Sequence, residues 1–106
     1  MRWSLLRLEA RLRERAKAPP DESYTRWLLD KGPVGCAKKL GEEATELVIA
    51  AVSEADDRLV YEAADIMYHL LVLLMARKRS FSDVEAELRR REGISGLAEK
   101  AARTGK

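Results

Sequence analysis

Apolar residues recur every three or four positions through most of the chain, which is the spacing of an amphipathic helix. Leu5, Leu8 and Leu12 show this spacing in the first, arginine-rich segment. Prolines and glycines are few and fall between such segments, where they end helices. The pattern predicts four helices over residues 4–17, 24–31, 34–54 and 58–79, and a fifth that opens with the capping-box sequence Ser82-Asp83-Val84-Glu85 and ends at Gly93.

The two central helices have the most apolar sequences. One face of the third helix carries Leu40, Ala44, Leu47 and Ala51. The fourth is apolar almost all round, and a helix without a polar face is buried by its neighbours or by a second subunit. No alternation typical of strands and no internal repeat occurs. We therefore expect an all-α fold of four to five helices.

Composition adds limits on the class of protein. A chain of 106 residues predicts a single domain over 1–106, in which residues 98–106 form a tail that need not be ordered. Its one cysteine, Cys36, excludes an internal disulfide and a multi-thiolate metal site. The start of the chain lacks the apolar segment of a signal peptide, and the longest apolar run, 66–76, is shorter than a membrane span. We expect a cytoplasmic protein.

Charge is distributed unevenly along the chain. Residues 1–17 and residues 89–106 each contain six basic and two acidic side chains, whereas the net charge of the whole chain is only +2. The basic ends leave open a helical module that binds nucleic acid, whose affinity would fall steeply with salt. That interpretation leaves the acidic residues of the apolar fourth helix without a role.

Acidic residues form a stripe on the fourth helix. Glu62, Asp65 and His69 are three and four positions apart, so they share one face. Antiparallel helices joined by a short turn can bring this stripe opposite the acidic residues of the third helix, which are Glu42, Glu43 and Glu46.

Carboxylates that converge away from water repel one another and must be neutralised. Ion pairs with Lys38 and Lys39 are one possibility, and for the third helix alone they would suffice. Glu62 and Asp65 face a helical interior, where an unpaired charge costs several kcal/mol by order of magnitude. The two stripes together favour a hard divalent cation such as Mg²⁺, which binds carboxylates, waters and substrate phosphates.

Several other residues have two interpretations. His69 either packs in the core or orients Asp65 and contacts a phosphate. Trp3 and Trp27 can stack on a base, but packing is the expected role of a tryptophan on a helix. Basic side chains late in the chain are either solvated or bind phosphate, and they include Lys100 and Arg103.

Four segments of the chain resemble the phosphoribosyl-ATP pyrophosphohydrolase family. They are, in order, Ser23-Tyr24-Thr25, the acidic stretches 38–46 and 62–71, and residues 93–100, which read Gly-Ile-Ser-Gly-Leu-Ala-Glu-Lys. The acidic stretches are shared with the wider group of MazG-like all-α nucleotide pyrophosphohydrolases. The first and last segments point to the narrower family.

The resemblance implies hydrolysis of phosphoribosyl-ATP to phosphoribosyl-AMP and pyrophosphate, the second step of histidine biosynthesis. It also implies dependence on Mg²⁺, no nucleic-acid or membrane partner, and a MazG-like bundle completed by formation of a homodimer. The alternatives are a MazG-like enzyme that acts on free nucleoside triphosphates and the non-enzymatic nucleic-acid-binding module.

The same resemblance implies roles for individual residues. Four carboxylates match the metal ligands of the family, and they are Glu43, Glu46, Glu62 and Asp65. Glu42 or Glu46 would activate the attacking water, and the sequence does not choose between them. The expected contacts to substrate are Lys39, Lys38, His69, Lys100 and Arg103.

Overall fold

The computed structural model describes residues 2–53 and 55–104, and over these residues the chain forms helices and no strand. The all-α prediction is therefore confirmed. The number of helices is six instead of four to five, and they are α1 (Leu5–Arg15), α2 (Tyr24–Leu29), α3 (Gly32–Ser53), α4 (Asp56–Ala76), α5 (Phe81–Arg91) and α6 (Gly96–Thr104).

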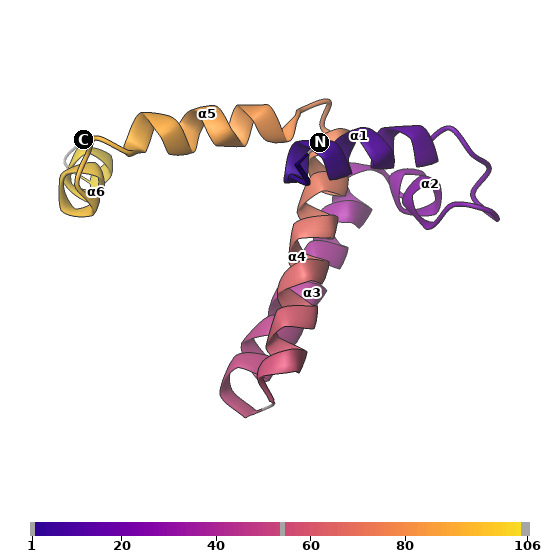
Figure 1. Ribbon diagram of the computed structural model, residues 1–106, viewed down its shortest axis with the longest axis horizontal. Helices are drawn as coiled ribbons and strands as arrows, with labels where there is room; N and C mark the ends of the chain where they lie inside the picture. The colour runs from indigo at the N-terminus through magenta and orange to yellow at the C-terminus, as the bar shows by residue number, and fades with distance from the viewer. Residues whose placement is uncertain (1, 54, 105–106) are drawn as a thin grey trace.

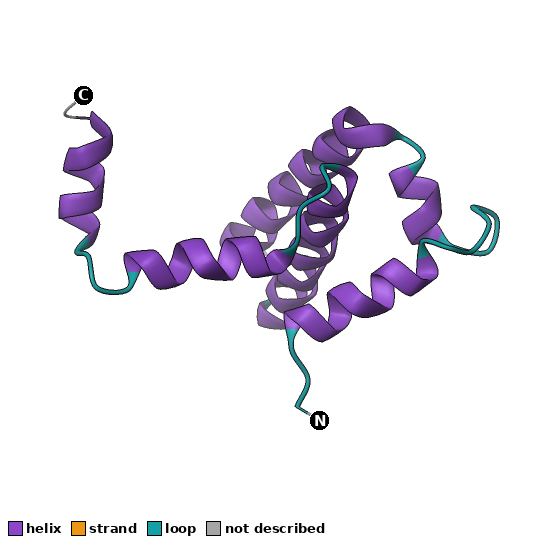
Figure 2. Cartoon of the chain, turned by 90° about the horizontal axis from the view of Figure 1, so that it is seen from above, coloured by secondary structure: helices purple, strands orange, loops and turns teal. Residues whose placement is uncertain are grey.

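The two long helices α3 and α4 run side by side in opposite directions and form the stem of the molecule (Figure 1). Helices α1 and α2 lie across one end of this stem, where α4 ends and α5 begins. From that end α5 extends away from the stem, and α6 follows at its tip (Figure 2). We call α5 and α6 together the arm. The arrangement places the acidic faces of α3 and α4 next to each other.

The hydrophobic core lies where α1, α2, α3 and α5 meet the second half of α4. Its buried members are Leu12, Leu28, Cys36, Leu71, Val72, Met75 and Phe81. Burying an aliphatic or aromatic side chain of this size contributes roughly 1.5–3 kcal/mol, so this cluster holds the helices together.

The remainder of the stem is less well covered. Large apolar side chains of α3 and α4 are exposed there, namely Val48, Ile49, Val52, Val60, Tyr61 and Met67. Ala44 and Ala51, from the predicted face of α3, are exposed as well, and the chain buries Cys36 and Ala50 instead. The fourth helix was predicted to be buried by its neighbours or by a second subunit. Within one chain, the neighbouring helices bury mainly the second half of α4.

Helix boundaries follow local capping. Ser23 accepts a hydrogen bond from the backbone N–H of Arg26 at 3.1 Å and caps α2, as predicted. The predicted capping box of α5 was wrong by two residues, because Ser80 is the extended N-cap residue and Ser82 already lies in the helix. The carboxylate of Asp83 accepts from the backbone N–H of Ser80 at 3.1 Å and completes the box.

The end of the chain adds a sixth helix. Residues 96–104 form α6, which includes most of the segment 98–106 for which the sequence predicted a tail that need not be ordered. The backbone N–H of Ala98 donates to the hydroxyl of Ser95 at 3.0 Å, which caps the start of this helix. Residue 54, the predicted end of the third helix, and residues 105–106 of the tail lie outside the described residues.

Helix α4 is long and apolar enough to cross a membrane, by length and composition alone. A single such helix is a weak indication of a membrane span, because core helices of soluble proteins have the same properties. Glu62, Asp65 and His69 interrupt its apolar sequence.

Candidate active site

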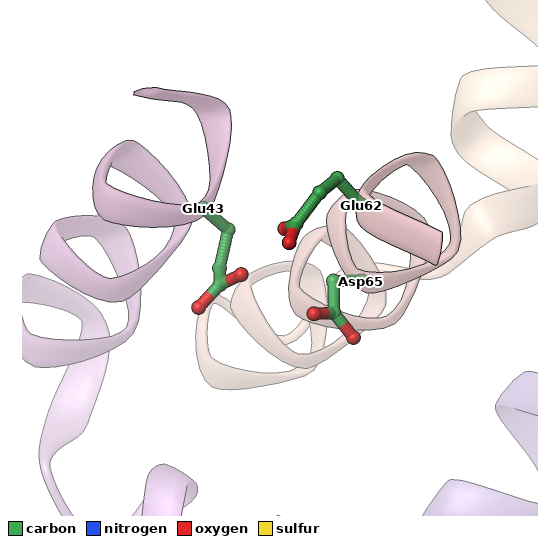
Figure 3. A group of neighbouring side chains, drawn as sticks. All are labelled: Glu43, Glu62 and Asp65. Carbon is green, nitrogen blue, oxygen red and sulfur yellow. The ribbon is translucent and has the colours of Figure 1, made fainter. Parts of the chain in front are cut away.

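Three carboxylates converge between α3 and α4. One oxygen atom from each of Glu43, Glu62 and Asp65 lies within 4.8 Å of the other two, and Figure 3 shows the side chains pointing toward one another. Glu62 and Asp65 share a face of α4 because they are three residues apart, and the antiparallel helix α3 supplies Glu43 from the opposite side. The predicted meeting of the two acidic stripes is thus observed for these three residues, which we call the triad.

Glu62 is the most buried member of the triad. Its side chain is only 3% exposed, and its Oε1 atom forms an ion pair with Arg58 Nη2 at 2.6 Å. Its other oxygen, Oε2, is buried and has no hydrogen-bond partner. Burial raises the pKa of Glu62 while Arg58 lowers it, and the neighbouring charges of Asp65, Glu43 and Glu46 raise it further.

An orphaned carboxylate oxygen is costly unless a ligand satisfies it. The triad therefore fits a cation, and the all-oxygen donor set suits a hard divalent ion better than a soft one. Its three carboxylates carry more negative charge than the two cations paired with them, Arg58 and Lys39, neutralise.

Lys39 lies at the edge of the triad. Its ammonium is 3.3 Å from Oε1 of Glu43 and 3.8 Å from Oε1 of Glu42, at the four- and three-residue spacings of one helix face. The hydrogen bond to Glu43 raises the pKa of Lys39. A lysine so placed stays charged and can contact an anion that approaches the acids.

Two carboxylates assigned roles from the resemblance lie outside the triad. Both Glu42 and Glu46 are exposed on α3. Glu46 is still close enough for its charge to raise the pKa of Glu62. The structure thus brings together three of the four expected metal ligands, and the roles of Glu42 and Glu46 stay predictions.

His69 is buried in the wall of the cavity next to the triad. This cavity has a volume of about 550 Å³, and its lining includes Glu43, Asp65, His69 and Tyr24. The His69 ring meets the rings of Tyr68 and Tyr24 edge-on, at centroid distances of 5.0 and 6.3 Å. Burial lowers the pKa of His69, which favours the neutral imidazole.

The other predicted substrate contacts are dispersed. Lys38 is exposed and lines a neighbouring cavity, together with Lys39. Lys100 and Arg103 lie on α6, at the tip of the extended arm and away from the stem (Figure 1). Within one chain the structure does not bring these two residues to the acids, and their contact with substrate stays a prediction.

Sequence reasoning missed three residues near the site. Arg58, which pairs with Glu62, is four residues before it, and this spacing was a usable signal. The hydroxyls of Tyr68 and Thr25 are 2.8 Å apart and join α4 to α2 beside the cavity. No spacing rule predicts that contact, because its partners are 43 residues apart.

The fold and the site together define an all-α protein whose central helix pair holds a carboxylate cluster suited to a divalent cation. Comparison with known proteins agrees, since residues 5–92 match the family described as phosphoribosyl-ATP pyrophosphohydrolase. The chain belongs to this family.

Relatives named phosphoribosyl-ATP pyrophosphatase align with nearly the whole chain. The relative from Dinoroseobacter shibae is 56% identical over 99 residues, which cover 93% of this chain and 97% of that protein. Those from Rhodobacter capsulatus and Nitrobacter winogradskyi are 55% and 54% identical, over 94% and 96% of this chain and 97% and 88% of their own lengths. The resemblance based on four segments is thus confirmed.

Proposed function

We propose that this protein hydrolyses phosphoribosyl-ATP to phosphoribosyl-AMP and pyrophosphate, the second step of histidine biosynthesis, in the cytoplasm. The observation that carries the proposal is the unpaired, buried oxygen of Glu62 within a carboxylate triad, in a chain that belongs to this family. In the reaction, the oxygen of water bonds to a phosphorus atom as the α–β phosphoanhydride bond breaks. The water proton passes to a base.

We infer that Mg²⁺ is the cation and that Glu43, Glu62 and Asp65 hold it, with Glu46 as a fourth ligand. Mg²⁺ takes about six oxygen ligands and retains several waters, so a site built from carboxylates leaves positions for water and phosphate. When bound, it supplies positive charge against the charge that develops on the phosphoryl oxygens.

The base is a carboxylate that the cation does not saturate. Glu42 and Glu46 are exposed at the edge of the triad, so either can accept the proton of the attacking water. Glu42 already lies near Lys39, at 3.8 Å, and this contact orients its carboxylate.

The remaining assigned residues bind or position the substrate. Lys39 contacts the triphosphate, and Lys38 adds charge at the neighbouring cavity. His69 forms the wall behind the triad. Lys100 and Arg103 of α6 add positive charge that would close over the substrate.

A second copy of the chain completes the bundle. The single chain exposes 7795 Å², against about 6,000 Å² for a compact monomer of its mass. Its radius of gyration is 16.1 Å, against about 13 Å for a compact domain of this length. The exposed apolar side chains on both stem helices supply the surface for a homodimer.

The dimer is tested by sedimentation equilibrium. Val48 is 61% exposed on the stem, so Val48→Glu should give a monomer. Ala10→Glu adds the same charge to an exposed position on α1 and should leave the dimer intact. A wild-type monomer at micromolar concentration would refute the dimer.

The activity is tested by pyrophosphate release from phosphoribosyl-ATP, ATP and dUTP, with Mg²⁺ and then with EDTA. We expect release from phosphoribosyl-ATP that EDTA abolishes. Faster release from the free triphosphates would keep the metal chemistry and refute the substrate. No release, together with salt-dependent binding of nucleic acid, would refute the enzyme and favour the binding module.

A further inference from the structure

A short column of aromatic rings stands beside the carboxylate site. The rings of Tyr24 and Trp27 are stacked, with centroids 5.6 Å apart and planes 18° from parallel. Tyr24 also stacks with Tyr68, at 6.2 Å and 15°. Tyr68 is held in turn by its hydrogen bond to Thr25. The column is therefore anchored to α4 at one end.

Tyr24, the middle ring, and Trp27, at the other end of the column from Tyr68, are not packed into the core of the single chain. Tyr24 is 51% exposed and Trp27 is 46% exposed, so within one chain Trp27 packs only partly, against Tyr24. Two large aromatic rings that remain half-exposed while fixed in parallel planes offer a stacking surface. The π-face of any nucleobase fits such a surface.

The column connects to the site through shared cavity walls. Tyr24 lines the cavity of the acids together with Glu43 and Asp65. It also lines the neighbouring cavity of about 330 Å³, whose wall includes Trp27, Lys31 and Lys39. A ligand can thus extend from the triad, past Lys39, to the stacked rings without leaving the protein surface.

Lys31 also lines this second cavity. Its ammonium lies over the face of the Trp27 ring, 4.1 Å from the ring centroid. No carboxylate of the described residues forms an ion pair with it. Because Lys31 has no acidic partner there and its side chain is flexible, it can give up the face of the Trp27 ring to a base and bind a phosphate attached close to that base.

We propose that Tyr24 and Trp27 bind the purine ring of phosphoribosyl-ATP, and that Lys31 binds the phosphate of the ribose added to that ring. This inference rests on the proposed function. The triphosphate then reaches Lys39 and the triad, and the added phosphate, which ATP lacks, reaches Lys31. The rings of Tyr24 and Trp27 hold the substrate in place, and Lys31 distinguishes phosphoribosyl-ATP from ATP.

The first test removes the stacking surface. Trp27→Ala should raise the KM for phosphoribosyl-ATP roughly 5- to 150-fold, the range found for loss of one base–aromatic stack, with little change in kcat. Trp27→Phe keeps a π-face and should restore most of the loss. A wild-type KM in Trp27→Ala would overturn the proposal and leave the proposed activity intact. Dissociation of a dimer by this variant would also overturn the proposal, because it would show that the ring packs against a second copy.

A binding measurement separates this proposal from the activity. Trp3→Phe leaves Trp27 as the one tryptophan, so its fluorescence reports on this site. Phosphoribosyl-AMP should quench it and inorganic pyrophosphate should not. If the wild type fails to hydrolyse phosphoribosyl-ATP, quenching by purine nucleotides would still support the stacking site, and its absence would overturn it.

The last test concerns Lys31. Lys31→Met should raise the KM for phosphoribosyl-ATP roughly 10- to 150-fold, as expected for loss of a charged contact, and leave inhibition by ATP unchanged. Arg89→Met, which removes one positive charge from an exposed position on α5 that lines neither cavity, is the matched control. An equal loss for both nucleotides, or no loss, would overturn the assignment of Lys31.

Discussion

A buried carboxylate on α1 fixes the start of the α5 arm, and its removal gives a sharp prediction. Glu9 is 5% exposed. Its Oε1 accepts a hydrogen bond from the Ser80 hydroxyl at 2.8 Å, and its Oε2 accepts one from the backbone N–H of Phe81 at 2.7 Å. The carboxylate thus satisfies an N–H group of the first turn of α5, which no residue of that helix can satisfy.

The cost of Glu9→Ala follows mainly from these two contacts, because the third, an ion pair with Arg13 at 3.7 Å, involves a half-exposed guanidinium and contributes little. A hydrogen bond to a charged group contributes about 1.5–3 kcal/mol, and the buried Phe81 N–H would lose its partner. Because the Ser80 hydroxyl can turn to water, we expect a loss of about 3–4 kcal/mol rather than the full sum. Glu9→Gln keeps one acceptor oxygen and should lose about half as much. Small domains have about 5–15 kcal/mol in total, so the alanine variant is severely weakened.

Urea unfolding followed by circular dichroism measures these losses, with hydrogen exchange of the Phe81 amide as a local readout. Glu14→Ala is the control, because Glu14 lies on the same helix but is exposed and forms a surface ion pair with Lys17. It should change stability by less than about 0.5 kcal/mol. A Glu9→Ala protein within about 1 kcal/mol of the wild type would refute the reasoning, since the two contacts would then contribute no more than a surface pair.

Three further predictions concern the site. Asp65→Asn and Glu46→Gln should each lower turnover by orders of magnitude with an unchanged circular dichroism spectrum, and near-normal turnover in both would exclude the metal assignment. Mg²⁺ at a hundredfold excess over its Kd should stabilise the protein by about 2.7 kcal/mol in a thermal scan, and EDTA or Glu62→Gln should remove this gain. Burial lowers the pKa of His69 in the folded chain, so below about pH 6.5 the unfolded chain binds a proton at this residue more readily than the folded chain does. The stability that comes from a neutral His69 is therefore lost as the pH falls. Urea titrations with EDTA at pH 7.5 and 5.5 should therefore show a larger acid loss for the wild type than for His69→Gln, and equal losses would contradict the sign.

The helix pair and most of the acidic site could be predicted because both depend on spacing within one helix. Glu62 and Asp65 must share a face of any helix that contains them. Whether Glu43 or Glu46 of α3 lies closest to these two acids could not be predicted in this way, because it depends on how far α3 is shifted along α4. That shift is set by packing between helices, and no periodicity within one of them encodes it.

Other features depended on contacts between distant residues. The capping box of α5 begins at Ser80, whose hydroxyl also donates to Glu9, 71 residues earlier in the chain. From the sequence alone, Ser82 was an equally good cap. The exposure of Trp27 could not be predicted from the sequence, because a tryptophan on a helix is expected to pack and only contacts with other helices decide how far it does so. The site residues of α6 stay predictions for the same reason, since their partners depend on where the arm lies.

Arg58 has a consequence for how the protein handles its cation. It already occupies one oxygen of Glu62 and lies over the ring of Tyr61, 4.6 Å from the centroid, so a counter-charge is built into the site. We therefore expect the helix pair to form without a metal ion, unlike small domains that fold only around one. A cation that enters the site would compete with this arginine for Glu62, which would offset part of its binding energy. We expect such a cation to exchange readily and to arrive and leave together with the phosphates of the substrate.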